Sequence, residues 1–195
     1  MITVNAVGDQ CPIPVIKTKK AMEALAGPDI IEVLVDNEIA VQNVSKMASG
    51  GGATKISTEK ISDKEFKVII EMSGSMEETA EHSGENMVVV IASDLMGSGN
   101  DELGKVLMKG FIFAVTQLSQ LPKTILFYNG GATLTAEGSD SIEDLKNMEA
   151  QGVEILTCGT CLNYYNLSDK LQVGAVTNMY SIVEKMAAAD KIVRP

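Results

Sequence analysis

Apolar and polar positions in residues 1–72 alternate with the periods of short strands and amphipathic helices. A strand at 2–4 is followed by a helix that starts near Pro12, where Val15, Thr18, Met22 and Leu25 recur at helical spacing. The same criteria predict a strand at 30–35, a helix at 40–48 that ends at a triple glycine, and strands at 54–59 and 66–72. The order strand, helix, strand, helix, strand, strand predicts a small two-layer α/β sandwich.

Residues 87–195 show a different pattern, which opens with a continuous apolar run at 87–92. Such a run is typical of a strand buried on both faces in a parallel sheet. Further strands are predicted at 124–128, 153–157, 173–176 and 191–193, and helices at 103–118, 141–151 and 179–188. Strands that alternate with helices predict a Rossmann-like, mainly parallel α/β domain.

Between these patterns lies the polar segment 73–86, which contains four glutamates and the only histidine, His82. It holds too little apolar surface to order itself, and we expect an acidic flexible linker. The predicted domains are therefore 1–72 and 87–195, joined by the linker 73–86.

The helix predicted at 103–118 is apolar around most of its circumference. A helix without a polar stripe needs cover on two sides, from its own sheet and from another molecule. This pattern predicts a homo-oligomer formed through the C-terminal domain.

The formal net charge of −10 over 195 residues argues against a general nucleic-acid binder, which needs clustered Lys and Arg. Lys17, Lys19 and Lys20 form a basic run, which is either a solvated helix face or an attraction for an acidic partner. No apolar run approaches the length of a membrane span, and the first residues lack the pattern of a signal peptide. We therefore expect a cytoplasmic protein with no membrane association.

Cys11 lies where the first predicted strand gives way to the first helix. Pro12 and Pro14 favour a helix start, because prolines are tolerated where backbone N–H groups have no helical partner. At this position the helix dipole and a free N–H group such as that of Ile13 would favour the thiolate of Cys11. The alternative is that Cys11 is a small buried apolar residue.

The run Gly8-x-x-Cys11-Pro12-x-Pro14, followed by a Lys-rich helix, resembles the signature of the TusA/SirA-like sulfur-carrier proteins. The resemblance spans about residues 1–72. It implies that Cys11 carries sulfur as a persulfide, with a cysteine desulfurase or another sulfur or selenium donor, and acceptor proteins, as partners. The family often has a hydrophobic residue where this chain has Asp9-Gln10, which bears on the choice of partner.

In the second domain, five polar or thiol residues follow strands whose carboxyl ends meet at one edge of a parallel sheet: Asp94, Asn129, Cys158, Cys161 and Asn178. A Cys-x-x-Cys at a strand-to-helix junction lowers a thiol pKa, forms a redox disulfide or supplies half a zinc site. Zinc is disfavoured, because there is no second such pair and His82 lies in the linker. Cys161, which opens the next helix, is the better nucleophile, with Cys158 as a supporting thiol.

Gly97-x-Gly99 followed by Gly104 suggests a phosphate loop between a strand and a helix. Its spacing fits neither of the common nucleotide-binding patterns, and Asp101-Glu102 would repel phosphate. We therefore predict no cofactor and no metal site.

The glycine-rich loop, Asn129-Gly130-Gly131 and the run Cys158-Gly-Thr-Cys161-Leu-Asn-Tyr-Tyr together resemble the DsrE-type sulfur-relay domain. A TusA-like domain joined to such a domain resembles the YedF group, which is associated with selenium metabolism. The resemblance implies a second reactive thiol at Cys161 and assembly into oligomers.

The leading hypothesis is a carrier that passes sulfur or selenium between Cys11 and Cys161. One alternative is a non-catalytic regulatory or binding module, in which Cys11-Pro12-x-Pro14 serves only to start a helix. Another is a dithiol redox protein that uses Cys158 and Cys161.

Overall fold

The structure is a computed structural model that describes residues 1–10, 12–74 and 86–195. The chain divides into two compact units, residues 1–81 and 82–195. Cys11 and most of the predicted linker, including His82, lie outside the described residues.

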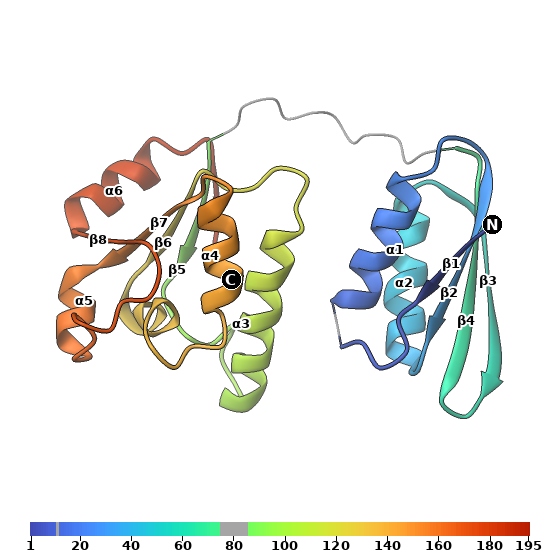
Figure 1. The fold of residues 1–195 in the computed structure, drawn as a ribbon, viewed down its shortest axis with the longest axis horizontal. Coiled ribbons are helices and arrows are strands. Elements are labelled where there is room, and N and C mark those ends of the chain that lie inside the picture. Colours follow the sequence, from blue (N-terminus) through green and yellow to red (C-terminus); the bar gives the residue numbers. More distant parts are fainter. Residues whose placement is uncertain (11, 75–85) are drawn as a thin grey trace. The chain divides into compact units, whose positions relative to one another are not determined.

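The first unit is a four-stranded sheet with two helices on one face (Figure 1). The sheet order is β1-β2-β4-β3, in which β1 runs parallel to β2 and the other neighbours are antiparallel. The elements are β1 (Ile2–Asn5), α1 (Ile13–Glu23), β2 (Asp29–Val35), α2 (Glu38–Gly50), β3 (Ala53–Ser62) and β4 (Glu65–Met72). The predicted two-layer sandwich and its order of elements are confirmed.

The core of the first unit lies between the two helices and the sheet. Met22 of α1 and Val44 of α2 are fully buried against Ile31 and Ile70 of the central strands. Thr18 is the buried polar residue on α1, and its hydroxyl donates to the carbonyl of Pro14 at 2.8 Å. The polar face of α1 thus turns outward and its apolar face closes the core.

The second unit is a five-stranded sheet with the order β8-β7-β6-β5-β9, in which every neighbouring pair is parallel. The predicted parallel α/β architecture is confirmed. Its strands are β5 (Met87–Ile91), β6 (Thr124–Phe127), β7 (Glu154–Cys158), β8 (Ala175–Thr177) and β9 (Lys191–Val193). Its helices are α3 (Asp101–Thr116), α4 (Ile142–Ala150), α5 (Gly159–Tyr164) and α6 (Met179–Ala187), with a 3₁₀ helix η1 (Asn129–Thr135) that the sequence pattern did not predict.

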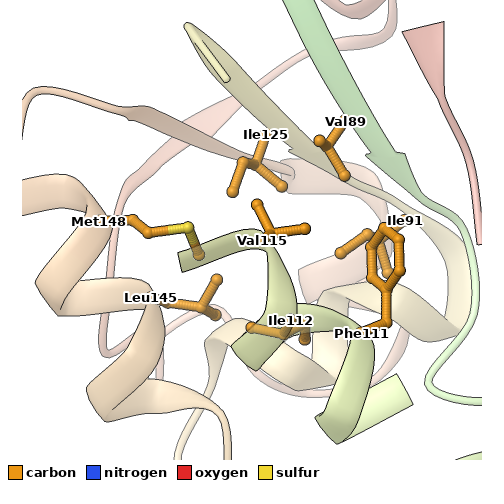
Figure 2. A pocket seen from close by; sticks show the side chains of 8 residues that line it. All are labelled: Val89, Ile91, Phe111, Ile112, Val115, Ile125, Leu145 and Met148. Carbon is orange, nitrogen blue, oxygen red and sulfur yellow. The ribbon is translucent and has the colours of Figure 1, made fainter. Parts of the chain in front are cut away.

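Helices cover both faces of this sheet, with α3 and α4 on one side and α5 and α6 on the other (Figure 1). Figure 2 shows the packing under α3 and α4, where Phe111 and Ile112 of α3, Leu145 and Met148 of α4 and Ile91 of β5 line one apolar space. The space between these side chains has no room for a water molecule. It is therefore a packed core and not a ligand cavity.

Helix α3 buries one face only, which carries Met108, Ile112 and Val115. Leu103, Val106 and Leu107 are 56%, 62% and 44% exposed, respectively. We define these three residues as the α3 stripe. The predicted cover from its own sheet is present, and no described residue of the second unit covers the α3 stripe.

Among the described residues, no helix combines the length and the apolar character needed to cross a bilayer.

Candidate functional site

A tight turn follows β6 at the carboxyl edge of the parallel sheet. The N–H of Tyr128 donates to the carbonyl of Ile91 at 3.2 Å, and the N–H of Gly131 donates back to the carbonyl of Tyr128 at 3.1 Å. Between them Asn129 has a φ of +49°, in the left-handed region. We call residues 128–131 the Asn129 turn.

The Asn129 turn contacts Cys161, the third residue of α5. The backbone N–H of Asn129 donates to Sγ of Cys161 at 3.0 Å. The hydroxyl of Tyr165 donates to Oδ1 of the same asparagine at 3.2 Å. Sequence reasoning placed Asn129 and Cys161 at one sheet edge, and the structure brings the two residues into direct contact.

Cys158 is the last residue of β7 and the N-cap of α5, and it is 2% exposed. Its side chain belongs to the core under α5 and α6, against which the partly buried Cys161 packs. Both are free thiols. Cys161 is thus the member of the pair that solvent reaches, and Cys158 lies behind it.

Burial raises the pKa of the Cys161 thiol above its ordinary value. The Asn129 N–H acts in the opposite direction, whereas a hydrogen bond with Cys158 and the charge of Cys158 raise the pKa further. A lowered pKa was one of the three possibilities for the Cys-x-x-Cys, and the direction at Cys161 is the opposite. The upward direction arises mainly from burial, because burial disfavours the charged thiolate.

The other residues expected at this edge have different surroundings. Asp94 lies beside Gly130, where a β carbon would come 3.2 Å from its Oδ1. Asn178 is the N-cap of α6, and its side chain accepts a hydrogen bond from the N–H of Ser181. Neither residue contacts a described cysteine through any hydrogen bond found in the structure.

The described part of the chain brings no three His, Cys, Asp or Glu side chains together as potential metal ligands. The glycine-rich loop before α3 is closed by its own contacts. Asn100 caps α3 by accepting from the N–H of Leu103 at 2.9 Å, and the N–H of Met96 donates to the carbonyl of Gly104 at 3.0 Å.

At the start of α1, Pro12 is the N-cap residue and Pro14 occupies the first turn, where its ring is buried. The N–H of Ile13 donates to the carbonyl of Gln10 at 2.9 Å. The Ile13 N–H thus has a backbone partner in a local turn, whereas its predicted contact with the Cys11 sulfur lies outside the described residues. Lys17 pairs with Asp9 and donates to the carbonyl of Asn5, and Lys19 pairs with Glu23 at 3.5 Å, so Lys17 and Lys19 of the basic run are both engaged within this unit.

Sequence reasoning missed Tyr165 as a site residue. It was read only as part of the run after Cys161, and its spacing of four residues from Cys161 gave no indication of a bond to Asn129. The backbone conformation of Asn129 was also missed, although Asn before two glycines is a known left-handed turn signal.

Comparison with known proteins concerns mainly the first unit. Residues 2–72 match the family described as sulfurtransferase TusA. A candidate sulfur carrier protein of Methanocaldococcus jannaschii is 36% identical over 70 residues, which cover 36% of this chain and 92% of that protein. Through its first unit, this chain belongs to the TusA family of sulfur carriers. A candidate sulfur carrier of Archaeoglobus fulgidus is 33% identical over 63 residues, covering 32% of this chain and 72% of that protein.

Two solved structures are also similar to parts of the chain. A SirA-like protein from Desulfitobacterium hafniense is 40% identical, with a TM-score of 0.35, and covers 37% of this chain and 99% of its own. A protein of unknown function from Methanobacterium thermoautotrophicum is 20% identical, with a TM-score of 0.44, and covers 56% of this chain and 97% of its own. The TusA assignment itself stands on the family match and the two sequence relatives.

Proposed function

We propose that this protein carries sulfur or selenium on Cys11 and passes it to Cys161, with a role in selenium metabolism. Membership of the TusA family supports the first half of the proposal, because the Cys11-Pro12-x-Pro14 motif lies within the matched residues. One observation supports the second half. Cys161 is a partly exposed thiol at the edge of a parallel sheet, and a backbone N–H lies 3.0 Å from its sulfur.

The transfer step conserves atoms and electrons. The Cys161 thiolate attacks the outer sulfur of a persulfide on Cys11, a new sulfur–sulfur bond forms on Cys161, and the old bond breaks to leave the Cys11 thiolate. One thiol loses its proton before the attack and the other regains one after it. No external oxidant or reductant takes part, and selenium follows the same path as a selenosulfide.

Loading with a cysteine desulfurase and isotopically labelled cysteine tests the proposal. We expect a mass gain of one sulfur atom on the wild type and on Cys161→Ser, and none on Cys11→Ser. Equal gain on Cys11→Ser would contradict the role of Cys11. Supplying a selenium donor in place of cysteine tests whether the heavier atom is accepted.

Mixing two single variants tests the relay. Loaded Cys161→Ser is incubated with unloaded Cys11→Ser, and the label is located by peptide mass spectrometry. Label on Cys161 of the acceptor supports transfer between molecules, and label on Cys161 only in the wild type supports transfer within one chain. Label that never leaves Cys11 would refute the relay and leave a simple carrier.

A dithiol redox protein is the second candidate function, and the contact between Cys158 and Cys161 favours it. It predicts a reversible disulfide between these residues that disappears in either single variant. A titration against glutathione, read by intact mass, separates this function from the relay, because the relay requires no such disulfide.

We further propose that the second unit assembles as a homo-oligomer through the α3 stripe, as the resemblance to DsrE-type domains implies. The support is the exposure of Leu103, Val106 and Leu107 on one side of the helix, since exposed apolar patches mark interaction surfaces.

A further inference from the structure

Asn129 is one of two described non-glycine residues with a positive φ, the other being Asn166. Left-handed backbone carries a steric cost for any residue with a side chain, and asparagine tolerates it better than most. Such a conformation persists only where its surroundings hold it. The contacts of the Asn129 turn therefore show which groups hold this conformation and which group it positions.

Four hydrogen bonds hold the turn, two of them to other elements and two within the turn and η1. The Tyr128 N–H is anchored on Ile91 at the end of β5, and the Gly131 N–H closes the turn on Tyr128. The Thr133 hydroxyl donates to the Gly130 carbonyl at 2.8 Å. The Tyr165 hydroxyl, which comes from the residue after α5, holds the Asn129 side chain. With these bonds made, the N–H of Asn129 is left aimed at Sγ of Cys161.

A neutral thiol is a weak hydrogen-bond acceptor, whereas a thiolate or a charged persulfide is a strong one. A bond from a fixed N–H to sulfur therefore gains strength as the sulfur becomes negative. While the thiol is neutral, this bond adds little to the stability of the fold. Its main effect is to stabilise the charged form of the sulfur. The same logic makes preorganised backbone N–H groups effective wherever negative charge develops in a reaction.

We propose that the Asn129 turn is an anion-binding element, in which the Asn129 N–H stabilises negative charge on the sulfur or selenium held at Cys161. Tyr165 is its positioning residue, because its hydroxyl fixes the Asn129 side chain and with it the left-handed backbone. The inference rests on the proposed function for the identity of the cargo. The stabilisation of charge on the Cys161 sulfur stands independently of any cargo.

Other polar groups border the site. Cys158 is the titratable residue whose charge affects Cys161, Asp94 lies beside Gly130, and Arg194 donates to the Tyr128 hydroxyl at 3.3 Å. A test of the Asn129 turn must therefore leave these groups unchanged or remove them equally from every variant compared.

The test uses a full-length parent, Cys11→Ser/Cys158→Ala, in which Cys161 is the only remaining thiol. The rate of alkylation by iodoacetamide is followed against pH. In this parent we expect Tyr165→Phe to slow alkylation at neutral pH by about threefold to tenfold and to move the pH profile upward. Tyr164→Phe is the matched control, since it removes the hydroxyl of the neighbouring, 79% exposed tyrosine.

A double-mutant comparison separates positioning from general loosening of the fold. Asn129→Gly keeps the N–H, adopts the left-handed backbone without a steric cost and lacks the oxygen that Tyr165 binds. Adding Tyr165→Phe to Asn129→Gly should therefore change the alkylation rate by less than about twofold. Cys161 should be alkylated more slowly in Asn129→Ala than in Asn129→Gly, because alanine keeps the steric cost of the left-handed backbone.

Two results would overturn the proposal. One is an alkylation profile of Tyr165→Phe that matches that of Tyr164→Phe. The other is an Asn129 amide whose ¹⁵N–¹H resonance does not shift when Cys161 titrates. Alkylation needs no sulfur donor, so these measurements remain decisive even if Cys161 never receives a persulfide, and that failure would be seen separately in the loading experiment.

Discussion

Gly131 approaches Ile91 so closely that a β carbon on this glycine would lie 2.2 Å from the Ile91 carbonyl oxygen. Backbone meets backbone at this point, so neither side can yield by rotating a side chain. The end of β5 therefore fixes the height of the Asn129 turn above the sheet, and with it the distance from Asn129 to Cys161.

Gly131→Ala should displace this turn. We expect a loss of about 1–3 kcal/mol in the free energy of unfolding, because the contact is overpacked, together with slower alkylation of Cys161. Gly130→Ala is the matched control, since its β carbon would meet the movable Oδ1 of Asp94 at 3.2 Å and no backbone atom closer than 3.5 Å. Denaturant melts and alkylation rates on both variants check this. Equal effects in the two variants would show that the close contact between Gly131 and Ile91 does not position the Asn129 turn.

The reactivity of Cys161 should rise with pH over a wider range than that of an ordinary cysteine. Burial raises the pKa of its thiol, so the thiolate fraction at neutral pH is low and the rate should climb about tenfold per pH unit below the pKa. Cys158→Ala removes a hydrogen bond and a charge that raise this pKa, so it should speed alkylation at neutral pH. A slower reaction in Cys158→Ala would contradict this account.

The same shift affects stability. A folded-state pKa above the unfolded value means that the contribution of Cys161 to stability is complete below the unfolded pKa. It is lost as pH rises through the folded pKa. Denaturant melts from neutral to alkaline pH should therefore show a decline that is smaller in Cys161→Ser than in the wild type.

Two buried threonines tie the 3₁₀ helix to the sheet under the site. The hydroxyls of Thr135 in η1 and Thr157 in β7 lie 2.9 Å apart, and Thr135 also donates to the carbonyl of Ala132. Thr135→Val should lower the free energy of unfolding by about 1–3 kcal/mol, because it leaves the buried hydroxyl of Thr157 without this hydrogen bond. Thr157→Val should lower it by about 1 kcal/mol, because the Thr135 hydroxyl keeps its bond to the Ala132 carbonyl. The double variant should cost less than the sum, which denaturant melts can measure.

The α3 stripe predicts the behaviour of the protein in solution. We expect light scattering to give a mass above that of one chain, and Val106→Glu or Leu107→Glu to reduce it to the single-chain value. Ile39→Glu is the control, because Ile39 is an exposed apolar residue, at 68%, on α2 of the first unit. A wild type that runs as a monomer at high concentration would refute the oligomer.

Much of this architecture is predictable because both units follow local rules. The continuous apolar run at 87–92 predicts a central parallel strand, and β5 pairs with β6 and β9 on its two sides. The rule that carboxyl strand ends share an edge brings Asn129 to Cys161 before any coordinates are seen. The helix start at Pro12 follows from proline chemistry to within one residue.

What sequence reasoning missed depends on contacts between distant segments. The conformation of Asn129 reflects anchors from β5 and from the end of α5, which no window around residue 129 contains. The raised pKa of Cys161 follows mainly from burial. The Cys-x-x-Cys motif alone does not show how deeply its cysteines are buried. A local contact was missed as well, because the Ile13 N–H donates to the carbonyl of Gln10.

The parallel sheet ends on each side in a strand of three residues, β8 and β9. Strands this short offer too few unpaired backbone groups to recruit a foreign chain, which is one way in which proteins avoid sheet-to-sheet aggregation. Growth of the sheet from molecule to molecule is thereby blocked at both margins. The sheet edge that carries Cys161 can accordingly stay exposed without the domain polymerising.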